Sequence, residues 1–226
     1  MSKCKSIKPL FVIIIALLIT GCSAFRSEIK GKFDGTASKN YKAEKVKVLF
    51  IFRHVRQKHG YDAIPKLIHP RNQIDDFDDI FTDALQEISN IKTYATFTDY
   101  ASDVNKPERR ALKDSLITQH DYVMNITILK ESSFAKYFLG EIFSTASITM
   151  FPIPYSQSYS INLDVYNAEG LLVKSYKRAT SLTKWVQTFL IFVYPFHTEK
   201  RKNEEIYVAF FHDIFKQIET EKILGK

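Results

Sequence analysis

The sequence predicts an α/β (α+β) domain in which a mixed β-sheet of about five strands has helices packed on it. In the middle of the chain, short runs rich in β-branched and aromatic residues alternate with longer runs whose apolar residues recur every three or four positions. A second observation is a pair of strand-like runs around a four-residue turn, which indicates a β-hairpin. The third is a long amphipathic run near the carboxyl end. The order β-α-β-α-β, then a hairpin, then a helix favours one mixed sheet.

Five segments make up the first part of this order. Lys45 to Val55 is apolar on both faces, which is typical of a central strand covered on both sides. Residues 71–91 form an amphipathic helical pattern with aspartates near its start, where the helix dipole favours acids. Residues 93–98 are predicted as a short strand, 108–120 as a weaker helix and 121–130 as a third strand.

The second part supplies the hairpin and the closing helix. Residues 159–166 and 171–179 are predicted as the two strands of the hairpin, and Gly170 between them can supply the positive φ of the turn. Residues 201–223 are predicted as the closing helix. Its apolar stripe consists of Ile206, Phe210, Phe211, Ile214, Phe215 and Ile218.

Two apolar segments, 134–157 and 185–200, are insertions relative to this minimal domain. Each follows a predicted strand, so both are expected to emerge near the same end of a regular hairpin. Neither contains an apolar run long enough to cross a bilayer as a helix, which needs about 20 apolar residues. Two interpretations stay open: contact with a membrane or a partner protein, or a fold-back that covers the open face of the sheet. The residues predicted for contact are Phe138, Leu139, Ile142, Phe143, Phe151, Trp185, Phe189 and Tyr194.

The amino terminus has the layout of a secretory signal. Three lysines among the first eight residues are followed by an apolar run from Leu10 to Ile19, and no acid occurs before that run ends. The run is about half as long as a helix that spans a bilayer, but its length suits the apolar core of a signal peptide. Residues 1–21 are therefore predicted to be a signal peptide.

Four residues at the end of this signal and the cysteine after it, Leu18-Ile19-Thr20-Gly21-Cys22, resemble the lipobox of bacterial lipoprotein precursors. The resemblance implies cleavage between Gly21 and Cys22, a covalent lipid on the Cys22 thiol and acylation of the new amino terminus. Several acyl chains on one residue anchor a protein stably, whereas one chain gives marginal binding. In that family an aspartate after the cysteine retains the protein in the inner membrane, so Ser23 implies the outer membrane. The side of that membrane stays open.

The rest of the chain is expected to be the lipidated Cys22 with a flexible tether over 22–44, followed by a single domain over 45–226. Removal of the three lysines in the signal lowers the formal net charge from +7 to +4. This mild charge without a basic stripe argues against a nucleic-acid partner. The other cysteine, Cys4, leaves with the signal, so no disulfide is expected and the fold depends on its hydrophobic core.

No catalytic or metal-binding motif stands out, so neither an enzyme nor a cofactor other than the covalent lipid is expected. His54, His59 and His69 lie close together in the sequence, but no carboxylate or cysteine stands at ligand spacing beside them, and a solvated loop is favoured over a metal site. The aspartates at 75–79 lack the glycine and final glutamate of a calcium loop. The chain contains no Gly-x-Ser-x-Gly elbow and no phosphate-binding glycine loop.

Thr118 to Met124, at the entry to the third predicted strand, and Ile161 to Tyr176, the predicted hairpin, carry a family resemblance. They resemble the corresponding strand entry and paired strands of the curli-secretion lipoprotein family and of the amino-terminal domain of the periplasmic propeller protein of the Tol system. The match covers residues 45–131 and 158–182, together with the last helix by position. The resemblance implies a shared α/β architecture.

Curli-secretion lipoproteins also carry two membrane-crossing β-hairpins, and many subunits close into one barrel. A barrel hairpin needs about two strands of 9–11 alternating residues, whereas Phe143 to Phe151 alternates poorly and Pro152 and Pro154 interrupt pairing. The sequence therefore favours an outer-membrane-anchored, non-enzymatic accessory or assembly subunit of the cell envelope, with membrane lipid and an envelope protein as partners. The alternative is an oligomeric secretion or transport channel component like the curli family.

Overall fold

The computed structural model of the chain describes residues 25–36, 38–39, 42–68, 77–133, 138, 153–186 and 199–225, with the backbone alone at 25, 153–154, 184–186 and 199–201. The elements in chain order are β1 (Phe25–Arg26), β2 (Val46–His59), β3 (Lys66–Leu67), α2 (Phe77–Leu85), β4 (Ile91–Asp99), the 3₁₀-helix η2 (Ala101–Asn105), α3 (Pro107–Thr118), β5 (Tyr122–Ser133), β6 (Ile153–Asn167), β7 (Leu172–Val186) and α5 (Glu199–Glu221).

The strands form one mixed sheet in the order β1-β7-β6-β5-β2-β3, and β4 pairs with β2 beside β3. β2 runs parallel to β4 and β5, whereas β5, β6 and β7 are antiparallel neighbours. Five of these strands are long, and β1 and β3 have two residues each. The mixed sheet and the closing helix that the sequence predicts are therefore confirmed.

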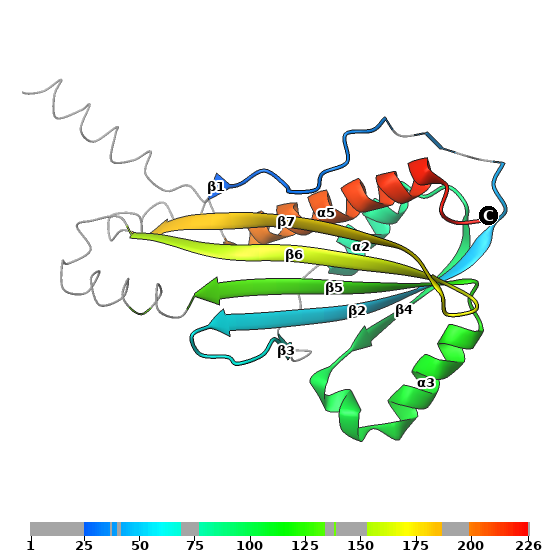
Figure 1. Cartoon of the computed structure of the whole chain (residues 1–226), viewed down its shortest axis with the longest axis horizontal. Coiled ribbons are helices and arrows are strands. Elements are labelled where there is room, and N and C mark those ends of the chain that lie inside the picture. The colour runs from blue at the N-terminus through cyan, green and yellow to red at the C-terminus, as the bar shows by residue number, and fades with distance from the viewer. Residues whose placement is uncertain are drawn as a thin grey trace, which may run out of the picture.

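The helices cover both faces of the sheet (Figure 1). The chain passes from β2 through α2 to β4 on one side of β2, and from β4 through α3 to β5 on the other side. Because crossovers between parallel strands are right-handed, two crossovers in opposite directions place their helices on opposite faces. The packing agrees, since α2 and α5 cover the face that carries Phe50, whereas Leu116 of α3 packs on the face that carries Leu49.

The larger core lies between the sheet and the pair α2 and α5. Phe50 and Phe52 of β2 meet Phe81 of α2 edge-to-face, with ring centroids 4.9 and 5.1 Å apart. Phe211 of α5 lies 5.9 Å from Phe81 and completes the cluster. Such pairs add roughly 0.5–1.5 kcal/mol each beyond their buried area. The apolar stripe predicted for the closing helix is buried along its whole length, which confirms Ile206, Phe210, Phe211, Ile214, Phe215 and Ile218.

A smaller core on the opposite face explains why the first predicted strand is apolar on both sides. Leu49 and Ile51 of β2, Phe97 of β4 and Val123 of β5 are buried there, with Leu116 of α3 packed against them. β2 lies between β5 and β4 in the sheet. The prediction of a central strand covered on both faces is confirmed.

In the first half of the chain, the ends of the first helix and of the first strand differ from the sequence pattern. The helix predicted over 71–91 is described over 77–85, and the chain then leaves the helix through hydrogen bonds between residues three apart, the last from Ile88 N to Leu85 O. Ile88 is still buried in the core, but Ile91 is already the first residue of β4. The apolar spacing that predicted the helix therefore extends past the residue at which the helix ends. The first strand runs to His59 because β5 supplies backbone partners for its polar second half.

Candidate membrane-facing site

The chain leaves and re-enters the described structure at one end of the sheet. β2 and β5 finish there with His59 opposite Ser133, and β6 starts there with Ile153 opposite Val186, the last residue of β7. We call this the exit end (Figure 1). The two apolar segments predicted as insertions therefore adjoin the same end of the sheet, as the sequence led us to expect.

The first described residues lie at the same end. Phe25 pairs with Thr183 and Arg26 with Leu182, antiparallel to β7, so β1 starts near the exit end and runs away from it (Figure 1). Cys22, the predicted lipid attachment site, precedes Phe25 by three residues. Cys22 and Gly21 themselves lie outside the described residues, and the cleavage and lipidation expected there stay predictions.

Part of the segment predicted as a tether lies against the domain. Residues 25–36, here called the strap, follow the outer edge of β7. Ser27 N donates to Ser181 O at 2.9 Å, and Lys30 and Ala179 exchange backbone hydrogen bonds of 2.8 and 3.3 Å. Gly31 has φ +79°, and a β carbon there would lie 2.8 Å from Lys177 O, so a glycine fits this close approach. The strap therefore holds the first described residues of the chain against the sheet.

A buried polar network fixes the strap. Asp213 of α5 accepts the Phe33 N–H at 3.1 Å, and its Oδ2 lies 2.5 Å from Nε of Arg178 on β7. The Arg178 side chain is 4% exposed and also donates to Gln217 on α5. The Gln217 amide donates to the Glu221 carboxylate, which also accepts the Tyr176 hydroxyl at 2.8 Å. Burial and the neighbouring Glu221 carboxylate raise the pKa of Tyr176, so the phenol stays protonated and keeps donating. Periodicity in the sequence does not reveal this network, because its members lie up to 180 residues apart.

The predicted contact residues lie mostly outside the described part of the chain. Phe138 is described and is 51% exposed, and Trp185 is paired with Pro154 through its backbone in β7. The others lie outside the described residues: Leu139, Ile142, Phe143, Phe151, Phe189 and Tyr194. Among the described helices, none combines the length and the apolar character needed to span a bilayer.

The strands extend into both predicted insertions. β6 starts at Ile153 rather than near 159, and β7 continues to Val186. Pro154 lies within β6 opposite Trp185, so the expectation that this proline interrupts pairing is wrong. β5 pairs with β6 only as far as Gln157, so Pro154 has a ladder partner on one side alone among the described strands. A residue without an N–H is tolerated at such an edge position.

The apolar face of the hairpin is already covered by α5. Ile161 and Leu163 of β6 are fully buried in the core that α5 closes, and Asn203 of α5 accepts the Tyr159 hydroxyl at 2.7 Å. The opposite face is polar: Asn162 donates to Asp164 at 2.9 Å across its surface. Within the described residues, the exposed large apolar side chains of the hairpin lie at its turn, at Leu171, Leu172 and Val173. The two apolar segments themselves lie mostly outside the described residues.

The histidines singled out in the sequence are separated by the fold. His54 is 6% exposed in β2 between the rings of Phe52 and Phe77, and burial lowers its pKa to about 4. His59 is paired with Glu131 at 2.9 Å, and His69 lies outside the described residues. In the part of the chain that the structure describes, no three potential ligands gather into a metal site.

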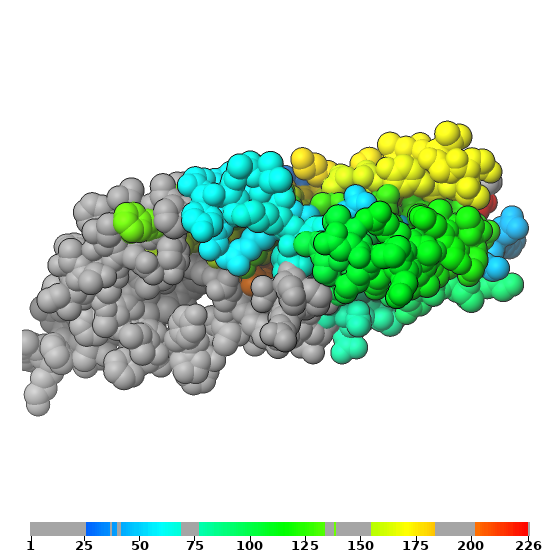
Figure 2. Space-filling view, turned by 90° about the horizontal axis from the view of Figure 1, so that it is seen from below, coloured from blue at the N-terminus to red at the C-terminus, as the bar shows by residue number. Residues whose placement is uncertain are grey.

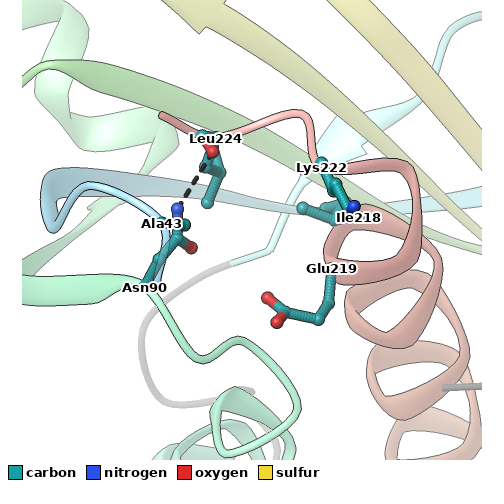
Figure 3. Close-up of a pocket in the computed structure, with 6 residues that line it drawn as sticks. All are labelled: Ala43, Asn90, Ile218, Glu219, Lys222 and Leu224. Atoms are coloured by element: carbon teal, nitrogen blue, oxygen red, sulfur yellow. Dashed lines mark hydrogen bonds between the residues drawn. The ribbon is translucent and has the colours of Figure 1, made fainter. Parts of the chain in front are cut away.

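The described pockets show no enclosed site of ligand size. The pocket in Figure 3 has a volume of about 10 Å³, roughly that of one water. Its Asn90 side chain donates to Leu224 O at 3.0 Å, which ties the carboxyl terminus to the turn before β4. Its lining residues are Ala43, Asn90, Ile218, Glu219, Lys222 and Leu224. A groove of about 650 Å³ along α2 and α5 opens to solvent and is lined partly by Asp79, Glu204 and Glu205.

No protein-family model matches the chain, and no curated protein matches its sequence. Among solved structures, it is similar to the PelC dodecamer from Paraburkholderia phytofirmans in space group P6, with 10% identity, a TM-score of 0.32, and coverage of 86% of this chain and 97% of that chain. A PelC variant dodecamer from the same organism, in space group C2, gives 9% identity, a TM-score of 0.31, and coverage of 86% and 98%. At these scores the likeness carries no argument about function.

Proposed function

We propose that this chain is an outer-membrane-anchored lipoprotein that acts as a non-enzymatic accessory or assembly subunit of the cell envelope. The lipid on Cys22 holds it, and the apolar segments at the exit end contact the bilayer or a partner protein. The observation that carries the proposal is that the start of β1, the end of β5 and the end of β7 lie at one end of the sheet, next to the predicted lipid attachment site and the two apolar segments in the sequence.

The strap supports the same orientation. Because residues 25–33 are bound along β7 and to Asp213, a lipid on Cys22 brings the exit end, not the opposite end, close to the membrane.

Cys22→Ala is expected to release the protein from the membrane or stall it as an unprocessed precursor. The thiol is the proposed site of the lipid, and alanine cannot be acylated there. Membrane fractionation of cells that express the full chain, with a mass shift for signal cleavage, measures the result. Cys4→Ala is the matched control, because Cys4 belongs to the predicted signal and its loss should change nothing. A Cys22→Ala protein that is cleaved and still sediments with membranes contradicts the proposal.

Ser23→Asp is expected to move the protein from the outer to the inner membrane. The change leaves Cys22 and its lipid in place, and the sorting rule of the lipoprotein family implies retention by an aspartate at this position. Density-gradient separation of the two membranes reports the shift, and Ser23→Asn controls for the size of the side chain. If Ser23→Asp stays in the outer-membrane fraction, the choice of membrane proposed here is wrong while the anchor stands.

A further inference from the structure

The turn between β2 and β3 carries the two most exposed large apolar side chains in the described part of the chain. Tyr61 is 71% exposed and Ile64 is 69% exposed. The sequence places them in a loop rich in His, Lys and Pro, and nothing in that pattern marks them. Scattered single apolar residues are normal on a surface, but two within four residues at a projecting turn need a reason.

The turn is held in one shape by its own hydrogen bonds. Gly60 has φ +88°, and Tyr61 N and Asp62 N both donate to Lys58 O, at 3.0 and 2.8 Å. The Asp62 carboxylate, whose side chain is 9% exposed, accepts the Lys58 N–H at 2.9 Å and pairs with Lys66 at 2.7 Å. The Asp62 side chain therefore faces the backbone of the turn, whereas in a solvated loop it would face the solvent. Little conformational entropy would be lost when such a preorganised turn binds a surface.

The sheet register places this turn level with the amino-terminal anchor. Arg26 pairs with Leu182, Leu182 with Gln157, Gln157 with Ser132, and Ser132 with Lys58. Arg26 and Lys58 therefore stand in one row across five strands, about 19 Å apart at 4.8 Å per strand. Beyond that row, in the direction of the exit end, Tyr61 follows Lys58 by three residues. In the sequence, the predicted lipid site Cys22 precedes Arg26 by four residues.

Figure 2 shows the same arrangement on the surface. The β2–β3 hairpin, in cyan, stands toward the end of the molecule where the two apolar segments begin, whereas α3 and the β6–β7 turn lie toward the other end. A basic flank, with Arg56 exposed in β2 and Lys66 exposed at 63% in β3, stands beside the turn. A tyrosine and an aliphatic side chain ahead of basic residues suit the boundary between lipid head groups and acyl chains.

We infer that the β2–β3 turn is a second membrane contact, in which Tyr61 and Ile64 enter the interfacial layer of the bilayer that holds the Cys22 lipid. The inference rests on the proposed function, since the lipid brings the exit end to the membrane. One anchor lets a domain rotate, whereas two contacts at opposite edges of the sheet fix its angle to the bilayer. The strands then stand end-on to the membrane.

The test uses the full chain, processed in cells, purified and reconstituted into vesicles of phosphatidylethanolamine and phosphatidylglycerol. Ile64→Cys receives a nitroxide label, and Leu171→Cys is the matched control because Leu171 is 65% exposed on the β6–β7 turn at the other end. The mature chain has no other free thiol if Cys22 is lipidated, so the unsubstituted protein should take no label. Collisions of each label with oxygen and with a water-soluble nickel chelate are measured.

The expected result is a several-fold higher ratio of oxygen to nickel collisions at position 64 than at position 171. Equal ratios in protein that floats with the vesicles overturn the inference and leave the anchor intact. A label at position 64 that is shielded from both reagents indicates contact with a second copy of the chain and also overturns it. Protein that does not float, or that takes label at Cys22, refutes the lipid anchor and the inference with it.

Discussion

Asp213→Ala is expected to lower the free energy of unfolding by about 3–5 kcal/mol, the usual cost of breaking a buried ion pair from one side. The change leaves Arg178, which is 4% exposed, without the carboxylate that lies 2.5 Å from its Nε. A buried guanidinium without a partner keeps its desolvation penalty and loses the attraction that offsets it. The same change removes the acceptor of the Phe33 N–H, so the strap loses a contact as well.

Denaturant unfolding followed by circular dichroism measures the loss, and the double variant Arg178→Met, Asp213→Leu tests its cause. If the cost comes from the uncompensated charge, the double variant is more stable than Asp213→Ala, because well-packed apolar residues replace a buried pair at little cost. Lys202→Ala is the control: its pair with Glu205 is partly exposed and is expected to contribute roughly 0–1 kcal/mol. An Asp213→Ala variant as stable as the Lys202→Ala variant contradicts the prediction.

The effect of Asp213→Ala on the strap has its own readout. Amide hydrogen exchange at residues 25–33 is expected to accelerate more than exchange in β5, which the strap does not touch. Selective acceleration shows that the network orders the connection between the lipid site and the sheet. This link gives the buried pair a role in orientation in addition to its role in stability.

The elements that the sequence predicts well are those whose signal is local. The stripe of the closing helix repeats every three or four residues, and each member proves buried. The first strand is apolar on both faces, and α2 and α3 cover those two faces. In both cases the burial of a residue follows from its neighbours within one element, so a pattern over a dozen positions is enough.

The elements that the sequence predicts poorly depend on partners far along the chain. The polar residues that end β2, from Arg56 to His59, have the composition of a loop, and they form a strand because β5 offers a backbone ladder from Lys130 to Ser133. The strap has no periodicity, and its order comes from β7 and α5. The candidate site is thus half predictable: a local motif marks Cys22, whereas the projection of Tyr61 at the same end depends on register across five strands.

Acidification from pH 7 to pH 4 is expected to remove about 3 kcal/mol of stability through His54 alone, since each unit of pKa shift corresponds to about 1.4 kcal/mol. Burial lowers the pKa of His54 from 6.5 in the unfolded chain to about 4 in the folded protein. Between these values the unfolded state binds a proton that the folded state does not, so stability falls as the pH falls. Well above pH 6.5 both states hold a neutral imidazole, and this residue then contributes no pH dependence.

His54→Phe isolates this contribution. The ring of His54 already lies against Phe52 and Phe77, and its Nε2 has no hydrogen-bond partner among the described residues, so a benzyl side chain replaces it without breaking a side-chain hydrogen bond through that atom. The variant and the unsubstituted protein share all other titrating groups. The unfolding free energy of each protein is measured by denaturant titration at pH 7 and pH 4.5. Its loss between these two pH values is expected to be smaller in His54→Phe than in the unsubstituted protein. Equal losses in the two proteins would show that His54 takes up its proton in the folded state and that its burial does not govern the acid sensitivity of the domain.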